Sequence, residues 1–149
     1  MESMTRSEII HGRALVAGEA QGELLVSDEP LSFWGGYDQH TGEIIDRRHP
    51  LSGQVAAGRI LALPSTRGSS TTTAVLLEAI RRGTAPVALL TAGADSFLAL
   101  ASIVADELYQ KPLPVIALDP EDFAMLETGQ RLRVFDDGRV EIVEASQAS

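Results

Sequence analysis

The feature that most constrains the fold of this chain is the alternation of short apolar runs with helical patterns in its centre. Three runs, VAAGRILALP, APVALLT and LPVIALD, are short and largely apolar, which is typical of buried strands. Each is followed by a helix-start signal. The segments SSTTTAVLLEAIRRG and DSFLALASIVADEL predict helices, and PEDFAMLETG predicts a short helix with Pro120 in its first turn.

Strand patterns without helices occupy both ends of the chain. EIIHGRALVAG and AQGELLVSD are short alternating or β-rich runs, and QRLRVFDDGRVEIVE predicts a hairpin that turns at Asp137-Gly138. Along the chain, strands come first, alternating strands and helices follow, and a hairpin comes last. This order favours a mixed α/β fold: a mixed sheet or small β-barrel with helices packed on one side. We expect one domain over residues 1–149, with an ordered core over about 8–144 and short flexible tails.

Composition excludes several classes of function. The chain has no cysteine, so it forms no disulfide, thiolate metal site or cysteine nucleophile of its own. A formal net charge of -9 disfavours binding to nucleic acid or to anionic membranes. The N-terminus lacks a signal-peptide pattern, and Gly93-Ala94-Asp95 interrupts the one long apolar tract. These features predict a cytoplasmic location.

A long turn-rich region between Glu29 and Gln54, which includes FWGGYDQHTGEIIDRRHPLSG, follows the first strands. It is too polar and too broken to be expected in the core, and loops of this length are usually functional or mobile. Trp34 is expected either to wall a pocket or to pack under this loop. His11, His40 and His49 are scattered without the spacing of metal ligands, so we expect surface or loop residues.

The most informative stretch is PSTRGSSTTTAVLLEAI, in which a cluster of hydroxyl side chains and one arginine precedes a helical pattern. The plain reading is that Ser69 or Ser70 caps the helix. However, the stretch joins a strand end to a helix start, where ligands bind in α/β sheets, and free N–H groups there attract anions. Arg67 can pair with a carboxylate or phosphate, and Gly68 permits close approach of a ligand. We predict an anion site.

Two better-known motifs do not fit the same stretch. A P-loop requires a second glycine and a lysine, which are missing here. A nucleophile elbow requires the G-x-S-x-G frame, and no histidine is placed for a convincing triad. The anion site is therefore of another kind.

Four stretches together resemble the aconitase X small-subunit family, the swivelling domain of one branch of the aconitase superfamily. They are GRALVAGEAQGELLVSDEPLSFWGGYDQHTGEI, GRILALPSTRGSSTTTAVLLEAI, GTAPVALL and TGQRLRVFDDGRVEI, and the resemblance runs over about residues 10–143. It implies a β/β/α swivelling domain that closes over an aconitase-X-type large subunit. The assembled enzyme would be a hydro-lyase acting on a small carboxylate, with its iron–sulfur cluster held by the cysteines of the large subunit and no cofactor bound by this chain.

The resemblance also implies residue roles. Ser69, after Arg67-Gly68, matches the family's catalytic serine and would abstract the proton next to the substrate carboxylate while the cluster iron acts on the leaving hydroxyl. The residues implied in substrate binding are Arg67, Gly68, Ser70, Gly35 and Gly36. One departure is Thr72-Thr73, where the family has a glycine–serine pair, and this bears on the anion contacts.

Several readings stay open. The substrate is expected to be cis-3-hydroxy-L-proline, because the phosphate of the alternative, mevalonate 5-phosphate, would want more cationic charge than Arg67 supplies. A reading of another class is a non-catalytic anion-binding or regulatory module. A purely structural reading predicts that alanine at Arg67 or Ser69 costs only the stability of a helix cap, about 1 kcal/mol.

Overall fold

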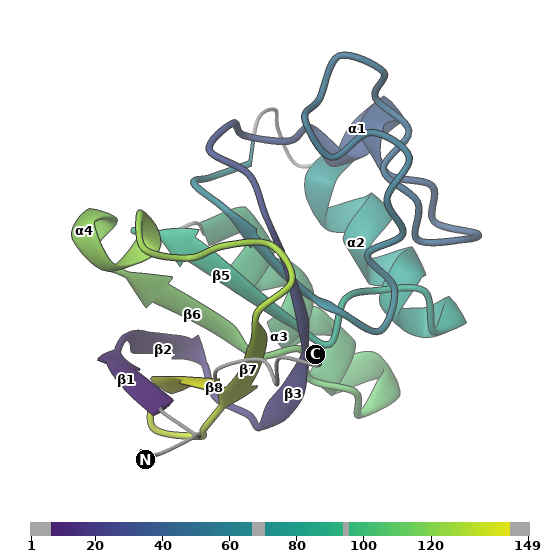
Figure 1. Ribbon diagram of the computed structural model, residues 1–149. Helices are drawn as coiled ribbons and strands as arrows, with labels where there is room; N and C mark the ends of the chain where they lie inside the picture. Colours follow the sequence, from purple (N-terminus) through teal and green to yellow (C-terminus); the bar gives the residue numbers. More distant parts are fainter. Residues whose placement is uncertain (1–6, 67–70, 94–95, 144–149) are drawn as a thin grey trace.

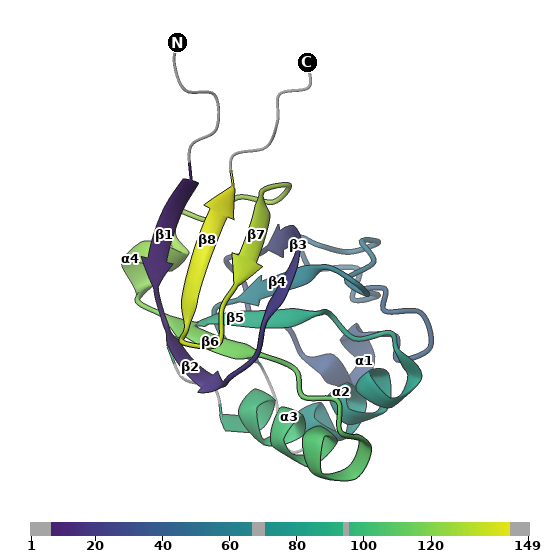
Figure 2. The same cartoon turned by 90° about the horizontal axis from the view of Figure 1, so that it is seen from below.

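The computed structural model describes residues 7–66, 71–93 and 96–143 of the chain. Within these ranges, eight strands form one mixed sheet in the order β1-β8-β7-β3-β4-β5-β6-β2 (Figures 1 and 2). The strands are β1 (Ser7–His11), β2 (Arg13–Val16), β3 (Ala20–Val26), β4 (Ile60–Leu63), β5 (Ala88–Ala92), β6 (Val115–Leu118), β7 (Arg131–Val134) and β8 (Arg139–Val143). The expectation of a mixed sheet or small barrel is confirmed.

The centre of the sheet is parallel. β3, β4, β5 and β6 run in the same direction, whereas β1, β2, β7 and β8 join by antiparallel pairing. Every residue of β4 and of β6 is buried, which explains why their sequences read as unbroken apolar runs. As a consequence of the parallel pairing, the carboxyl ends of four strands meet at one edge of the sheet.

The sheet curls into a small barrel at Gly12. β1 and β2 lie at opposite ends of the strand order, yet only this one residue separates them in the chain. The Gly12 N–H donates to the carbonyl oxygen of Gly138 at 3.0 Å. A Cβ atom at Gly12 would lie 2.6 Å from Ile116 Cγ2, so only glycine fits this corner without displacement.

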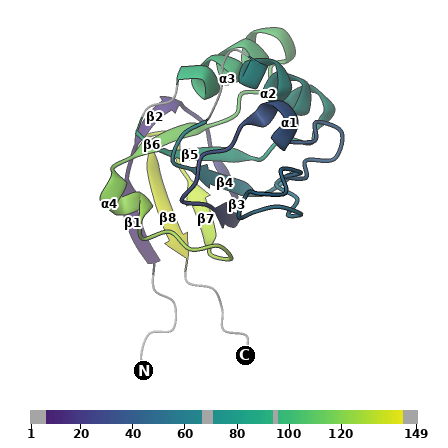
Figure 3. The same ribbon diagram turned by 90° about the horizontal axis from the view of Figure 1, so that it is seen from above.

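Two long helices cover one face of the sheet. α2 (Thr71–Arg82) and α3 (Ser96–Tyr109) pack against each other there, with α1 (Phe33–Gly36) beside α2 (Figure 3). α2 ends at Gly83, whose φ of 82° is the left-handed conformation typical of a helix stop. The short helix α4 (Pro120–Phe123) lies apart from both and places Phe123 in the barrel interior.

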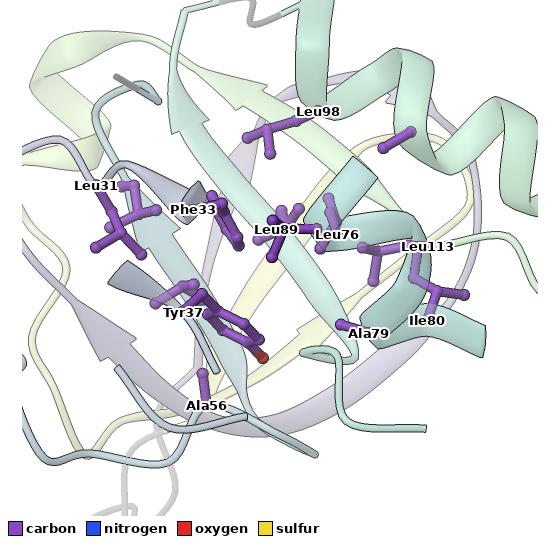
Figure 4. Packing of buried hydrophobic residues seen from close by; sticks show 14 of the residues in the cluster. Leu31, Phe33, Tyr37, Ala56, Leu76, Ala79, Ile80, Leu89, Leu98 and Leu113 are labelled. Carbon is purple, nitrogen blue, oxygen red and sulfur yellow. The ribbon is translucent and has the colours of Figure 1, made fainter. Parts of the chain in front are cut away.

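Alternation along the strands divides the buried side chains into two clusters. Leu61 and Leu89 belong to the cluster that also contains Leu76 and Leu98 of the helices. Figure 4 shows Leu89, Leu76 and Leu98 within this cluster. The flanking residues on the same strands, among them Ile60, point into the barrel with residues of β7 and β8. The sheet is thus apolar on both faces, as a parallel sheet sandwiched between helices and strands requires.

The expectation that the turn-rich region stays out of the core is wrong. Leu31, Phe33, Tyr37, Ile44 and Leu51 are all buried and belong to the cluster between helices and sheet. The Phe33 and Tyr37 rings lie 5.1 Å apart between centroids. The apolar residues of this region have no helical or strand period, so a periodicity argument cannot detect them.

His49 is in a loop, as expected, but it is buried. Its Nδ1 accepts from the N–H of Leu51 at 3.1 Å, which leaves the proton on Nε2. Nε2 then donates to the carbonyl oxygen of Glu29 at 3.3 Å. The ring thereby joins the two ends of the turn-rich region.

Among the helices of residues 7–66, 71–93 and 96–143, none has the length and apolar character that crossing a membrane demands.

Candidate functional site

The candidate site lies at the edge of the sheet where the four parallel strands end. The segments that leave this edge begin at Ser27 after β3, Pro64 after β4, Gly93 after β5 and Asp119 after β6 (Figure 1). Ligands of open α/β sheets bind outside the carboxyl ends of the strands. The stretch singled out in the sequence therefore occupies the edge that the fold makes available.

The motif loop, defined here as residues 64–70, leads from β4 to α2. Arg67, Gly68, Ser69 and Ser70, the predicted substrate-binding and catalytic residues, lie outside the described residues. Their flanks are described: Leu63 ends β4 fully buried, and α2 begins at residue 71 and runs for 12 residues. The predicted residues thus immediately precede the positive end of a helix dipole, a favourable place for an anion.

The structure brings the second glycine-rich stretch next to the motif loop. Leu31 pairs with Thr66 in a parallel bridge, although 35 positions separate them in the chain. The Phe33–Gly36 segment, which we call the FWGG turn, follows Leu31 directly, and α1 packs against α2. Gly35 and Gly36 therefore lie in a turn that packs on α2 and closely follows the bridge partner of Thr66, and their part in substrate binding stays a prediction.

The two glycines of this turn have different environments. Gly35 is exposed with a φ of 79°, and an added Cβ would meet no atom within 4 Å. Gly36 is buried, and its Cβ would lie 3.2 Å from Leu31 Cδ1. Gly35 suits the left-handed turn, and Gly36 lets the turn pack closely against Leu31.

Trp34 lies on the surface rather than under the loop. Its side chain is 68% exposed, which contradicts packing beneath the turn and leaves the pocket-wall interpretation. The turn itself is well anchored: Ser32 Oγ donates to the Trp34 carbonyl oxygen at 3.1 Å, and the Ile45 N–H donates to the Gly36 carbonyl oxygen at 2.9 Å. A large aromatic ring is therefore presented on a fixed support.

The neighbouring strand ends are tied together beneath the motif loop. The Ala92 N–H donates to Pro64 O at 3.3 Å, and the Gly93 N–H donates to Leu118 O at 3.0 Å. The hydroxyl of Thr91, which is fully buried, donates to the Gly93 carbonyl oxygen. Sequence reasoning missed Thr91. The sequence feature that could have indicated Thr91 is its hydroxyl, the only one in the otherwise apolar run APVALLT.

The described groups whose pKa is shifted lie at separate places in the fold. Burial raises the pKa of Tyr37, which lies beneath the FWGG turn. Hydrogen bonds from Arg81 and Arg82 lower the pKa of Glu78 to about 2 at the far end of α2. Arg139 lowers the pKa of Asp137 in the β7–β8 turn. None of these groups stands in the position of a general acid or base for the candidate site.

The residues of this chain do not fit an iron–sulfur cluster. Clusters are held by cysteine thiolates, and the 149-residue sequence has no cysteine. In the part of the chain that the structure describes, no three His, Asp or Glu side chains gather closely enough to hold a metal ion. Any such group would have to be held by residues of another chain or another domain.

Comparison with known proteins identifies the family. Residues 9–142 match the family described as the aconitase X swivel domain. A chain in the crystal structure of Thermococcus kodakaraensis aconitase X (holo-form) superposes with a TM-score of 0.83 at 35% identity, over 92% of this chain and 99% of that one. The chain therefore belongs to the aconitase X swivel domain family, and the predicted resemblance is confirmed.

Two kinds of curated relative share this domain. Cis-3-hydroxy-L-proline dehydratase from Pseudomonas aeruginosa is 48% identical over 93% of this chain, which spans 24% of that protein. The phosphomevalonate dehydratase small subunit of Thermococcus onnurineus is 38% identical over 91% of this chain and 98% of its own length. The chain thus corresponds to about a quarter of the first relative and to nearly all of the second.

Proposed function

We propose that this chain is the small subunit of a hydro-lyase that dehydrates cis-3-hydroxy-L-proline together with an aconitase-X-type large subunit. The observation that carries the proposal is the 48% identity to the Pseudomonas aeruginosa dehydratase over 93% of the chain. The position of the motif loop at the ligand-binding edge of the sheet supports it. The iron–sulfur cluster is assigned to the large subunit, because this chain lacks cysteine.

In this proposal Ser69 abstracts the proton from the carbon that bears the substrate carboxylate. The C–H electron pair then forms the carbon–carbon double bond, and the neighbouring C–O bond breaks as hydroxide leaves. The proton that Ser69 has taken combines with this hydroxide to give the released water and restores the alkoxide. A serine hydroxyl is a weak base in water, so it must react as an alkoxide in a closed site. The N–H groups at the start of α2 and the Arg67 guanidinium would stabilise that alkoxide.

The remaining predicted residues bind the substrate. Arg67 and Ser70 would hold its carboxylate, and Gly68 would let the backbone approach it. Gly35 and Gly36 would form the opposite wall, and the Leu31–Thr66 bridge, which ties the start of the FWGG turn to the residue before Arg67, supports this. Closure of the domain over the large subunit would exclude water from the alkoxide.

A second candidate is the corresponding subunit of a mevalonate 5-phosphate dehydratase. It is favoured by the match to nearly the full length of the Thermococcus onnurineus small subunit. Arg47 and Arg48 are both exposed and closely follow Ile45, whose N–H donates to the Gly36 carbonyl oxygen, and they would add positive charge for a phosphate. The two candidates differ in substrate and share Ser69 as the base.

The test is turnover by the chain co-expressed with the large subunit of the same organism. Wild type, Ser69→Ala and the control Ser52→Ala are assayed with cis-3-hydroxy-L-proline and with mevalonate 5-phosphate. Ser52 is exposed in the turn-rich region, so its loss should leave turnover unchanged. We expect turnover of the hydroxyproline alone, and a decrease of about 10²-fold or more for Ser69→Ala.

Each other outcome has a definite meaning. Turnover of mevalonate 5-phosphate instead would establish the second candidate. Full activity of Ser69→Ala would refute its role as base. No turnover of either substrate by an assembled, cluster-containing complex would favour a non-catalytic anion-binding module.

A further inference from the structure

A threonine interrupts the apolar interior near the end of β5. Thr91 is fully buried, and the other residues of β5 are alanines and leucines. A valine would fill nearly the same space without taking a hydroxyl out of water, which costs free energy unless the hydroxyl forms a hydrogen bond. The Thr91 hydroxyl does form one, to the carbonyl oxygen of Gly93. That bond is what a threonine provides here and a valine does not.

The hydrogen bond holds the turn by which the chain leaves β5. Gly93 has a φ of 100°, so the chain bends here in a conformation that suits glycine. The Gly93 N–H donates to the carbonyl oxygen of Leu118, at the end of β6, at 3.0 Å. The Gly93 carbonyl oxygen accepts from Thr91. Both peptide groups that flank Gly93 are therefore held.

The same turn holds the first residue of the motif loop. The N–H of Ala92, between Thr91 and Gly93, donates to the carbonyl oxygen of Pro64 at 3.3 Å. Thr91 itself pairs with Leu63 in the parallel ladder between β4 and β5. Because Leu63 is the last residue of β4, the Ala92–Pro64 bond extends the sheet by one residue into the motif loop.

The side chain of Thr91 lies on the face of the sheet that α2 and α3 cover. Leu89, two residues earlier in β5, belongs to the cluster between sheet and helices (Figure 4), and alternate residues of a strand share a face. Leu63, the ladder partner of Thr91, belongs to the same cluster. The hydroxyl therefore lies on the side of the sheet to which the motif loop crosses on its way to α2.

We propose that Thr91 is a positioning residue for the proposed reaction: its hydroxyl sets the turn at Gly93 and, through the Ala92–Pro64 bond, fixes where the motif loop begins. The inference rests on the proposed function, because it takes the motif loop as the carrier of the reacting groups. Thr91 acts through the loop and not on the substrate. A misplacement of about 1 Å in such groups can cost about 100-fold in rate.

The kinetic test uses the complex with the large subunit and both candidate substrates, cis-3-hydroxy-L-proline and mevalonate 5-phosphate. Thr91→Val keeps the shape of the side chain and removes the hydroxyl, whereas Thr91→Ser keeps the hydroxyl. We expect Thr91→Val to lower kcat about 10-fold or more with KM nearly unchanged, because alignment counts in the transition state. Thr91→Ser should recover most of kcat. Thr91→Cys, whose thiol is a weaker donor, should be intermediate and serves if Thr91→Val does not fold.

The matched control is Ser102→Ala. Ser102 is also fully buried, but its hydroxyl bonds to the backbone of Leu113, before β6 and at the opposite edge of the sheet from the motif loop. Its loss should destabilise the fold and leave kcat unchanged. Urea unfolding gives the stability of every variant, and the assays are run where all of them are folded.

A second measurement needs no turnover. Hydrogen exchange of the full chain, followed by NMR, reports the opening of single N–H groups. In Thr91→Val the Ala92 N–H should exchange about 5-fold faster or more than in the wild type, because its bond to Pro64 is weakened. The reference is the Val87 N–H, which donates to the Arg59 carbonyl oxygen at 2.8 Å, just before β5. Relative to Val87, exchange at Ala92 should be unchanged in Ser102→Ala.

The outcomes separate this inference from the proposed function. If the wild type turns over a substrate, full kcat in Thr91→Val, no recovery in Thr91→Ser or an equal fall in Ser102→Ala overturns the inference and leaves the function standing. Unchanged exchange at Ala92 in Thr91→Val overturns the inference whatever the kinetics. Faster exchange at Ala92 in Thr91→Val, with no turnover of either substrate by the wild-type complex, supports the hold of Thr91 on the motif loop and contradicts the reaction.

Discussion

The hydroxyl of Tyr37 donates a 2.7 Å hydrogen bond to the carbonyl oxygen of Thr84, and so joins the FWGG turn to the residue just beyond α2. The Thr84 hydroxyl in turn donates a hydrogen bond to the carbonyl oxygen of Gln39 at 2.6 Å. The turn that stands beside the motif loop is therefore fastened to the far end of the same helix. Its position depends on two reciprocal contacts as well as on packing.

Tyr37→Phe should lower the free energy of unfolding by about 1 kcal/mol, because it removes one hydrogen bond and leaves the Thr84 carbonyl without that donor. Urea unfolding measures the change. Tyr109→Phe is the control, because its hydroxyl makes no hydrogen bond to any described residue, and it should be close to neutral. An equal loss in both variants would contradict the importance of the Tyr37–Thr84 contact.

The stability of the same variant should also differ from that of the wild type in its dependence on alkaline pH. Burial raises the pKa of Tyr37 above its ordinary value of about 10. Above about pH 10 the tyrosine ionises in the unfolded chain but stays neutral in the folded protein, so the free energy of unfolding of the wild type falls as pH rises. Below that pH the tyrosine is neutral in both states and has no effect on the pH dependence. The Tyr37→Phe variant lacks this loss. The difference in stability between the two should therefore shrink above about pH 10, as urea unfolding from pH 7 to 11 would measure.

Gly12→Ala should destabilise the barrel corner by about 1–3 kcal/mol through overpacking. The new Cβ would lie 2.6 Å from Ile116 Cγ2 and 2.8 Å from Leu118 Cδ2. Gly22→Ala is the control, because that glycine lies buried within β3 and the atom nearest to its added Cβ would be Gly58 O, at 3.4 Å. Thermal unfolding of the two variants should separate them clearly; similar melting temperatures would argue against a tight corner at Gly12.

Much of the secondary structure could be predicted from local pattern. The helices over α2 and α3, the stop at Gly83 and the hairpin at Gly138 are where the sequence placed them, within a few residues. Each depends on signals that lie within one element, such as helical spacing and residues suited to positive φ. The class of fold followed from the order of those elements.

The non-local features could not be predicted in the same way. The run EIIHGRALVAG gives no sign that its two halves pair with β8 and with β6 at opposite ends of the sheet. That division arises from the bend at Gly12, whose neighbours come from β6 and from the β7–β8 turn. The buried residues of the turn-rich region were missed because their spacing has no period.

The candidate site was predicted as two separate stretches, and the fold explains their relation. The sequence predicted the motif loop at a strand–helix junction, and the parallel strands put that junction at the carboxyl-terminal edge of the sheet, where ligands of α/β folds usually bind. The proximity of the FWGG turn depends on the Leu31–Thr66 bridge, which no local pattern encodes. The exposure of Trp34 likewise follows from the turn's tertiary anchoring.

Ser102→Ala should lower the free energy of unfolding by about 1–3 kcal/mol, because it leaves two buried backbone groups unpaired. The fully buried hydroxyl of Ser102 accepts from the Leu113 N–H at 2.8 Å and donates to the Leu113 carbonyl oxygen at 2.5 Å. It thereby fixes the segment just before β6 against α3. Urea unfolding of Ser102→Ala and of the exposed control Ser52→Ala measures the difference, and equal stability of the two variants would refute it.

The pH dependence of Glu78→Gln tests the ion pairs at the end of α2. Glu78 Oε2 lies 2.5 Å from Arg81 Nη2 and 2.6 Å from Arg82 Nε, and these hydrogen bonds lower its pKa to about 2. A carboxyl with a lowered pKa in the folded state stabilises fully above its unfolded value near 4.5, and this contribution disappears as pH falls toward 2.

Glu78→Gln should therefore melt at a slightly lower temperature than wild type at pH 7, and at the same temperature near pH 2. The effect is small because the pair is exposed, and 1 M salt should reduce it further. Glu107→Gln on α3 is the control, because Glu107 is exposed and forms no ion pair with any described residue. A melting difference for Glu78→Gln that persists unchanged at low pH would mean that its side chain stabilises the helix by something other than its charge.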